Sequence, residues 1–140
     1  ESEGYFSDMT RTLLIHGPRL SEKKRIYQVV LSAQKKAMAT VSEGVKAQAV
    51  DKAAREEISR EGYGEYFGHS TGHGVGLDVH EYPRVSWTKG EKLTRGMVFT
   101  VEPGIYIPGL GGVRIEDMMA VTDSGVSTLT GLSRKPGIIR

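Results

Sequence analysis

Residues 97–122, MVFTVEPGIYIPGLGGVRIEDMMAVT, hold two segments of mixed apolar and polar residues on either side of the turn PGLGG. Such segments around a glycine-rich turn predict a β-hairpin, with strands at 97–107 and 112–122. In a hairpin that turns about PGLGG, Glu102 and Glu116 come within a residue or two of direct pairing. The sequence therefore predicts two acids side by side on adjacent strands.

The rest of the chain predicts two helices between strands and loops. Residues 5–15 alternate as a strand does. Helical spacing of apolar residues predicts one helix from an N-cap at Ser21 to about residue 40, and another from Ala47 to Gly62. Glycines and turn residues predominate from 63 to 96, and the tail after 124 predicts one more short strand.

Three of the four histidines lie in GHSTGHGVGLDVHE, residues 68–81. His69 and His73 have the four-residue spacing of a zinc-protease helix, but no glutamate lies between them. Glycines at 72, 74 and 76 also make a stable helix improbable. A loop or a distorted strand fits better, with glycines that allow a close approach of the backbone.

The composition limits the class of partner and of metal site. The 140 residues make one domain at most, and their formal net charge of +2 suggests neither nucleic acid nor an anionic membrane as a partner. No cysteine is present, which excludes disulfides and thiolate ligands and agrees with a reducing compartment such as the cytoplasm. The start, ESEGYFSDMT, has no initiator methionine and no signal-peptide core, so an internal start is expected.

The acids of the hairpin need a positive charge near them. Glu102 and Glu116 repel each other unless a cation lies between them, and both Arg114 and a divalent metal are candidates. A simple network of arginine and glutamate would by itself be the commoner arrangement. Asp8, which faces inward from the strand at 5–15, adds a third acid, and His73 offers a nitrogen. This ligand set suits manganese, iron, cobalt or zinc.

Four separated segments then match a known family in order and spacing: SDMTRT, HSTGHGVGLDVHE, VEPGIYIPGLGGVRIED and VTDSG. Together they resemble the pita-bread metallopeptidases, and among these the proline-specific branch of Xaa-Pro aminopeptidase and Xaa-Pro dipeptidase (prolidase). The resemblance implies an α/β (α+β) fold with a curved antiparallel sheet and helices on its outer face. Residues 1–140 would be the C-terminal portion of the catalytic domain, which leaves the fold incomplete at the N-terminal side.

The resemblance implies two divalent metal ions, with manganese expected first and cobalt or zinc as alternatives. The matching ligand positions are Asp8, His73, Glu102 and Glu116. By the family pattern Asp8 and Glu116 bridge the two metals, while His73 and Glu102 complete one of them. A fifth ligand, an aspartate about eleven positions before Asp8, is expected upstream of this chain. The chain alone is therefore expected to hold one ion or none tightly.

The resemblance also implies roles in catalysis. The Glu102 position would take and return a proton, and His80 would contact the substrate or shuttle protons. His69 would lie in the wall of the proline pocket, and Arg114 would orient the acids around the metals. The expected substrates are proline-containing peptides, and a homodimer is the expected assembly.

Two other functions compete with the proline-specific peptidase. One is a metal-free pita-bread pseudoenzyme that acts as a binding or interaction module, and all four ligand positions being intact disfavours it. The other is an enzyme like methionine aminopeptidase, from which the segments VEPGIYIP and GGVRIED differ. For the 140-residue chain itself, hydrolase activity is expected to be low.

Overall fold

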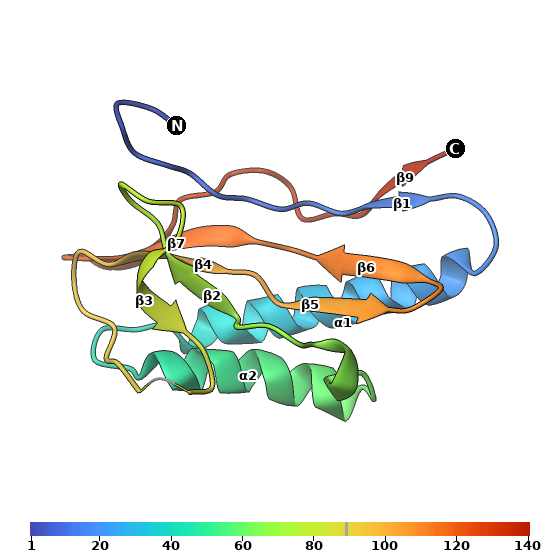
Figure 1. Ribbon diagram of the computed structural model, residues 1–140, viewed down its shortest axis with the longest axis horizontal. Helices are drawn as coiled ribbons and strands as arrows, with labels where there is room; N and C mark the ends of the chain where they lie inside the picture. Colours follow the sequence, from blue (N-terminus) through green and yellow to red (C-terminus); the bar gives the residue numbers. More distant parts are fainter. Residues whose placement is uncertain (89) are drawn as a thin grey trace.

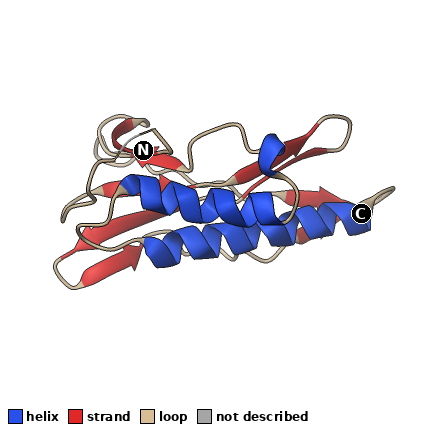
Figure 2. Cartoon of the chain, turned by 90° about the horizontal axis from the view of Figure 1, so that it is seen from below, coloured by secondary structure: helices blue, strands red, loops and turns tan. Residues whose placement is uncertain are grey.

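Two helices lie side by side along one face of a layer of β-strands (Figure 1, Figure 2). The computed structural model describes residues 1–88 and 90–140. In chain order the elements are β1 (Leu13–Ile15), α1 (Leu20–Thr40), α2 (Ala47–Arg60), the 3-10 helix η1 (Gly64–Tyr66), β2 (Gly72–Gly74), β3 (Glu81–Val85), β4 (Val98–Val101), β5 (Gly104–Ile107), β6 (Gly111–Arg114), β7 (Asp117–Thr122), β8 (Gly125–Thr128) and β9 (Gly137–Ile139).

The helices form because apolar side chains recur every three or four residues and so share one face. The buried side chains of α1 include Ile26, Val30 and Ala37, and the same spacing buries Val50 and Ile58 of α2. No helix among the described residues is long and apolar enough to cross a membrane.

The predicted helix ends are correct at three of four places. The chain after α2 turns at Gly62, whose φ of 85° suits a residue without a side chain. The predicted N-cap at Ser21 is wrong, because the helix begins at Leu20. Arg19 precedes the helix with its backbone in the left-handed region, and its side chain makes no capping hydrogen bond. The backbone turn after Pro18 therefore sets where the helix begins.

The hairpin predicted around PGLGG is confirmed, but each of its long strands is divided. β4 pairs with β7 and β5 pairs with β6, and the pairs Thr100–Met118 and Gly104–Arg114 keep one register. This register places Glu102 opposite Glu116, and both lie in the short breaks between the paired segments. Pro103 contributes to the break because it has no backbone N–H to donate. The two acids therefore lie where the sheet hydrogen bonding is interrupted.

The predicted curved antiparallel sheet holds for most of the strands. The main sheet has the order β3-β2-β4-β7-β8 with antiparallel neighbours, and β5-β6 is a separate antiparallel ribbon. The exception is β1, which pairs parallel with β9.

Three predictions of local structure differ from what the fold shows. Of the strand predicted at 5–15, only Leu13–Ile15 is a regular strand. The residues before it make isolated hydrogen bonds to side chains and to single backbone groups, in place of the continuous hydrogen bonding of a strand pair. The glycine-rich segment holds two strands, β2 and β3, and the tail holds two, β8 and β9, in place of one. Short strands whose partners lie far along the chain leave little local pattern.

The N-terminal segment crosses the sheet layer on the side away from the helices (Figure 1). It is tied there by two backbone bonds, from the N–H of Phe6 to the carbonyl of Gly76 and from the N–H of Glu116 to the carbonyl of Thr10. The core between helices and sheet includes Tyr27, Ile58, Phe99 and Ile105. This arrangement brings the segment with Asp8 over the breaks that hold the two glutamates.

Candidate metal centre

The strand that carries His73 fits between two neighbours because glycines flank the histidine. An added Cβ on Gly72 would lie 1.9 Å from the carbonyl oxygen of Thr100, and one on Gly74 would lie 2.1 Å from that of Tyr82. The register with β3 also shifts between His73 and Gly74. Of the two alternatives that the sequence left open for this segment, a loop or a distorted strand, the fold shows a distorted strand with close backbone contacts.

The four predicted ligand residues come together in the fold, from four separate segments. Asp8, His73 and Glu116 each offer a ligand atom, and these atoms lie within 4.8 Å of one another. The Nε2 atom of His73 lies 3.1 Å from Oε1 of Glu102 and 3.7 Å from Oδ2 of Asp8. All four side chains are at least partly buried, and together they form the acidic cluster.

The imidazole of His73 is oriented for its Nε2 atom to face the acids. Its Nδ1 lies 3.0 Å from the carbonyl oxygen of Gly74, which can only accept, so Nδ1 is the donor. Burial opposes the charged ring, but the hydrogen bond to Glu102, the Gly74 carbonyl and the charge of Asp8 outweigh it, and the pKa of His73 is raised. In the absence of a metal, the acids favour the protonated form of the imidazole, which would be a cation among them.

Glu116 is the most deeply buried of the three carboxylates, with 2% of its surface exposed. Burial raises its pKa, and the nearby charges of Glu102 and Asp8 raise it further, while the bond from Thr10 and the charge of Arg114 act in the opposite direction. The Thr10 hydroxyl donates to Oε2 of Glu116 at 2.5 Å. A buried carboxylate beside two others creates a demand for positive charge.

Arg114 lies at the edge of the acidic cluster. Its Nε atom donates to the Thr10 hydroxyl at 3.0 Å and is 3.9 Å from Oε2 of Glu102. The guanidinium therefore lies near Glu102 without a hydrogen bond to it, and reaches Glu116 through the Thr10 hydroxyl. The orienting role that the family resemblance implies for Arg114 stays a prediction.

Two threonines of the site were not predicted as site residues. Thr10 joins Glu116 to Arg114, and Thr100 donates to Oε1 of Glu102 at 3.2 Å and accepts the backbone N–H of His73 at 3.1 Å. Each lies two positions before or after a predicted ligand on an extended segment. The alternation of side chains along such a segment was the available signal.

The two other histidines of residues 68–81 differ in their relation to the cluster. The ring of His80 lies 4.0 Å from that of His73, centroid to centroid, and its side chain is exposed. His69 has other partners: its Nδ1 is 2.8 Å from the carbonyl of Ser70 and its Nε2 is 3.1 Å from the Tyr106 hydroxyl. The fold thus brings His80 against a candidate ligand and places His69 with an aromatic side chain.

The chemistry of these donors fits a divalent cation. One imidazole nitrogen and three carboxylates form a set of hard and borderline ligands, with threonine hydroxyls and Arg114 holding two of the carboxylates. A cation at the centre would relieve the repulsion among the acids and replace the proton on His73.

Comparison with known proteins gives the family. The family model for metallopeptidase family M24 matches residues 1–123. The Xaa-Pro dipeptidase of Pyrococcus horikoshii is 52% identical over 131 residues, which are 94% of this chain and 37% of that protein. The chain therefore spans little more than a third of the length of this curated relative.

Solved structures agree with this match. A dipeptidase from Pyrococcus horikoshii OT3 superposes with a TM-score of 0.93 at 51% identity, over 97% of this chain and 38% of that one. The X-Pro aminopeptidase from Thermotoga maritima MSB8 gives a TM-score of 0.91 at 43% identity, over 98% of this chain and 39% of that one. From the extent of the family match and the shared pita-bread fold, the chain belongs to metallopeptidase family M24.

Proposed function

We propose that this chain is the C-terminal portion of the catalytic domain of a metal-dependent peptidase that cleaves the bond preceding proline. The parent enzyme would act as an Xaa-Pro dipeptidase or an Xaa-Pro aminopeptidase, which are the names of its relatives. The observation that carries the proposal is the convergence of one imidazole and three carboxylates from four segments into the acidic cluster.

The acidic cluster is the proposed ligand set for two divalent ions, with manganese as the first choice and cobalt or zinc as alternatives. Asp8 and Glu116 would be shared between the ions, and His73 and Glu102 would complete the coordination of one of them. When bound, such ions polarise the scissile carbonyl and make water a stronger nucleophile near neutral pH. A further aspartate upstream of this chain is proposed as the fifth ligand.

The protein side chains handle the proton and the orientation of the groups. Glu102, held by Thr100, is the proposed residue that takes a proton from water and returns it to the leaving amine. His80 is exposed and lies against His73, which suits a group that meets the substrate. Arg114 would keep the carboxylates in place.

Substrate selection is proposed to involve His69. Its ring packs edge-on against Phe67 at 5.0 Å and lies 5.4 Å from the ring of Tyr106, centroid to centroid. Such an aromatic surface suits the apolar ring of proline. Proline-containing peptides are the proposed substrates, a homodimer the proposed assembly and the cytoplasm the proposed compartment.

Calorimetric titration of the metal-free chain with Mn²⁺, together with turnover of Gly-Pro and of a longer Xaa-Pro-Xaa peptide, tests the proposal. Since a ligand is expected from outside this chain, at most one tight ion and little turnover are predicted. His73→Gln should weaken the measured Mn²⁺ binding, tight or not, whereas the matched change His16→Gln, at an exposed histidine, should not.

Two tight ions with strong turnover would contradict the proposed division of the site between this chain and upstream residues. A folded chain that binds no divalent ion would contradict the metal site altogether. That second result would favour the competing function, a metal-free interaction module.

A further inference from the structure

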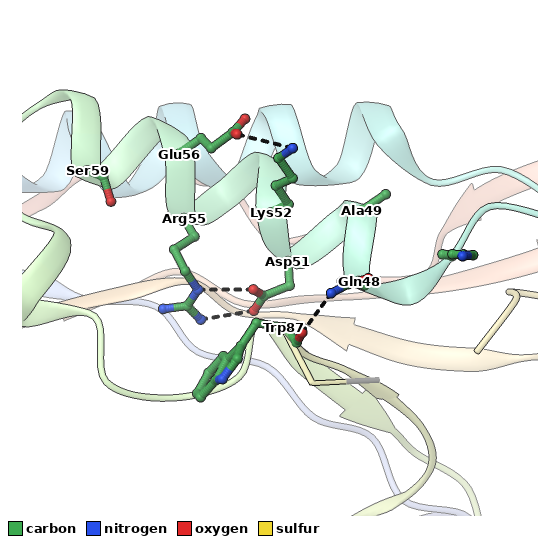
Figure 3. A pocket seen from close by; sticks show the side chains of 9 residues that line it. Gln48, Ala49, Asp51, Lys52, Arg55, Glu56, Ser59 and Trp87 are labelled. Atoms are coloured by element: carbon green, nitrogen blue, oxygen red, sulfur yellow. Dashed lines mark hydrogen bonds and ion pairs between the residues drawn. The ribbon is translucent and has the colours of Figure 1, made fainter. Parts of the chain in front are cut away.

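Asp51 and Arg55 form a bidentate ion pair on α2, one turn apart. The Nε and Nη2 atoms of Arg55 each lie 3.0 Å from a carboxylate oxygen of Asp51 (Figure 3). Asp51 is fully buried, although it lies on a helix whose other charged residues are mostly exposed. A buried acid needs further hydrogen bonds to offset its lost hydration.

Those further bonds go to the loop at residues 67–71. Arg55 donates to the carbonyl oxygens of Phe67 and His69, both at 2.9 Å. Asp51 accepts from the backbone N–H of Thr71 at 3.2 Å and from its hydroxyl at 2.8 Å. The two side chains therefore hold three alternate residues of this loop at four points.

Two aromatic rings also hold the guanidinium of Arg55. Its central carbon lies 4.2 Å from the ring centroid of Phe67 and 4.4 Å from that of Trp87. On the outer side, Asp51, Arg55 and Trp87 line a pocket of about 360 Å³ along α2 (Figure 3). The planar, permanently charged guanidinium suits this place, because a lysine could not stack and donate in several directions at once.

The loop leads directly to the acidic cluster. The carbonyl of Thr71 accepts the backbone N–H of Glu102 at 2.7 Å, and the next residue starts the strand that carries His73. His69 lies within the loop itself. The position of this loop thus sets where two candidate ligands and one candidate pocket residue lie.

We propose that Asp51 and Arg55 are positioning residues, which hold the loop at 67–71 so that Glu102 and His73 face the other acids. Neither residue belongs to the acidic cluster. The effect on metal binding rests on the proposed function, whereas the effect on the loop does not.

The test compares Arg55→Lys with the matched control Arg60→Lys. Arg60 lies on the same helix and pairs with another buried carboxylate, that of Glu57, so both changes remove one guanidinium from a helix ion pair. Amide hydrogen exchange by NMR reports the bond from the Glu102 N–H to the loop. The N–H of Val30, in the core of α1, reports general stability.

Arg55→Lys should speed exchange at the Glu102 amide at least tenfold, leave Val30 within about twofold, and weaken Mn²⁺ binding at least threefold. Arg60→Lys should change none of these selectively. Thr71→Val, which removes one contact from the loop side, should produce a smaller change of the same kind.

Equal acceleration at Glu102 and Val30 would overturn the proposal, because the pair would then stabilise the fold in general. Unchanged exchange at Glu102 would overturn it as well. If the unaltered chain binds no Mn²⁺ while exchange at Glu102 responds selectively, the positioning role is supported and the proposed metal function fails.

Discussion

Replacing Glu116 by glutamine tests whether the acidic cluster destabilises the metal-free fold. Glutamine keeps the shape of the side chain and an oxygen that accepts from Thr10, but removes one negative charge. Oxygens of Glu116 and Asp8 lie within 4.8 Å of each other. With an effective dielectric constant of about 20, two unit charges 4.8 Å apart repel by about 3.5 kcal/mol.

Part of this gain is offset. The substitution also removes the attraction of Glu116 to Arg114 and weakens the hydrogen bond from Thr10, at a cost of about 2 kcal/mol together. The metal-free Glu116→Gln protein should therefore be more stable than the unaltered chain by about 1–2 kcal/mol. For a chain of this size that is a rise in Tm of about 3–6 °C.

Thermal unfolding by circular dichroism in EDTA at pH 7 measures this difference, with Glu56→Gln on the exposed face of α2 as the control. Because the pKa of Glu116 is raised in the folded chain, its charge destabilises the fold only above the usual carboxyl range. The gain should therefore shrink as the pH falls through the usual carboxyl range, because Glu116 is then protonated in the folded chain and increasingly so in the unfolded chain. Saturating Mn²⁺ should reverse the order by stabilising only the unaltered chain.

A lower Tm for Glu116→Gln in EDTA at pH 7 would refute this reasoning. So would a gain that persists undiminished at pH 4, since protonation would by then have removed most of the charge of Glu116 from both the folded and the unfolded chain.

Three further outcomes are expected. Thr10→Val, which removes the hydroxyl bonded to Glu116, should weaken Mn²⁺ binding about tenfold by calorimetry, because a charge-assisted bond that orients the carboxylate is lost. Since the pKa of His73 is raised, Mn²⁺ affinity measured across pH should fall up to about tenfold per unit below that pKa, as protons compete for the ring. Gly72→Ala would place a Cβ 1.9 Å from a backbone oxygen and should lower stability by at least about 2 kcal/mol in chemical denaturation, whereas Gly68→Ala, with open space around it, should change it little.

The hairpin and its acids could be predicted because their signals are local. Alternation and the turn PGLGG predict a register in which Glu102 and Glu116 fall within a residue or two of direct pairing, and in the folded chain they lie opposite each other. The family resemblance supplied the same four ligand positions that the fold brings together. Asp8 lies at the far end of the chain from Glu116, so its strand pattern predicted only an inward-facing acid, and its place as a shared ligand came from that resemblance.

What could not be predicted depends on contacts between distant residues. β1 is short and pairs with β9, which lies more than a hundred residues further along the chain, so neither strand has a marked pattern of its own. Asp51 and Arg55 look like an ordinary helix-surface pair at i and i+4 in the sequence. Their burial and their contacts to the loop at 67–71 appear only once α2 is packed against it.

The measurement that tests the metal site most directly is anomalous X-ray diffraction from crystals of this chain soaked in Mn²⁺. A manganese peak is predicted within about 2.5 Å of Nε2 of His73 and of carboxylate oxygens from Asp8, Glu102 or Glu116. A peak at another place, or no peak in crystals that retain the fold, would contradict the assignment of the acidic cluster as a metal centre.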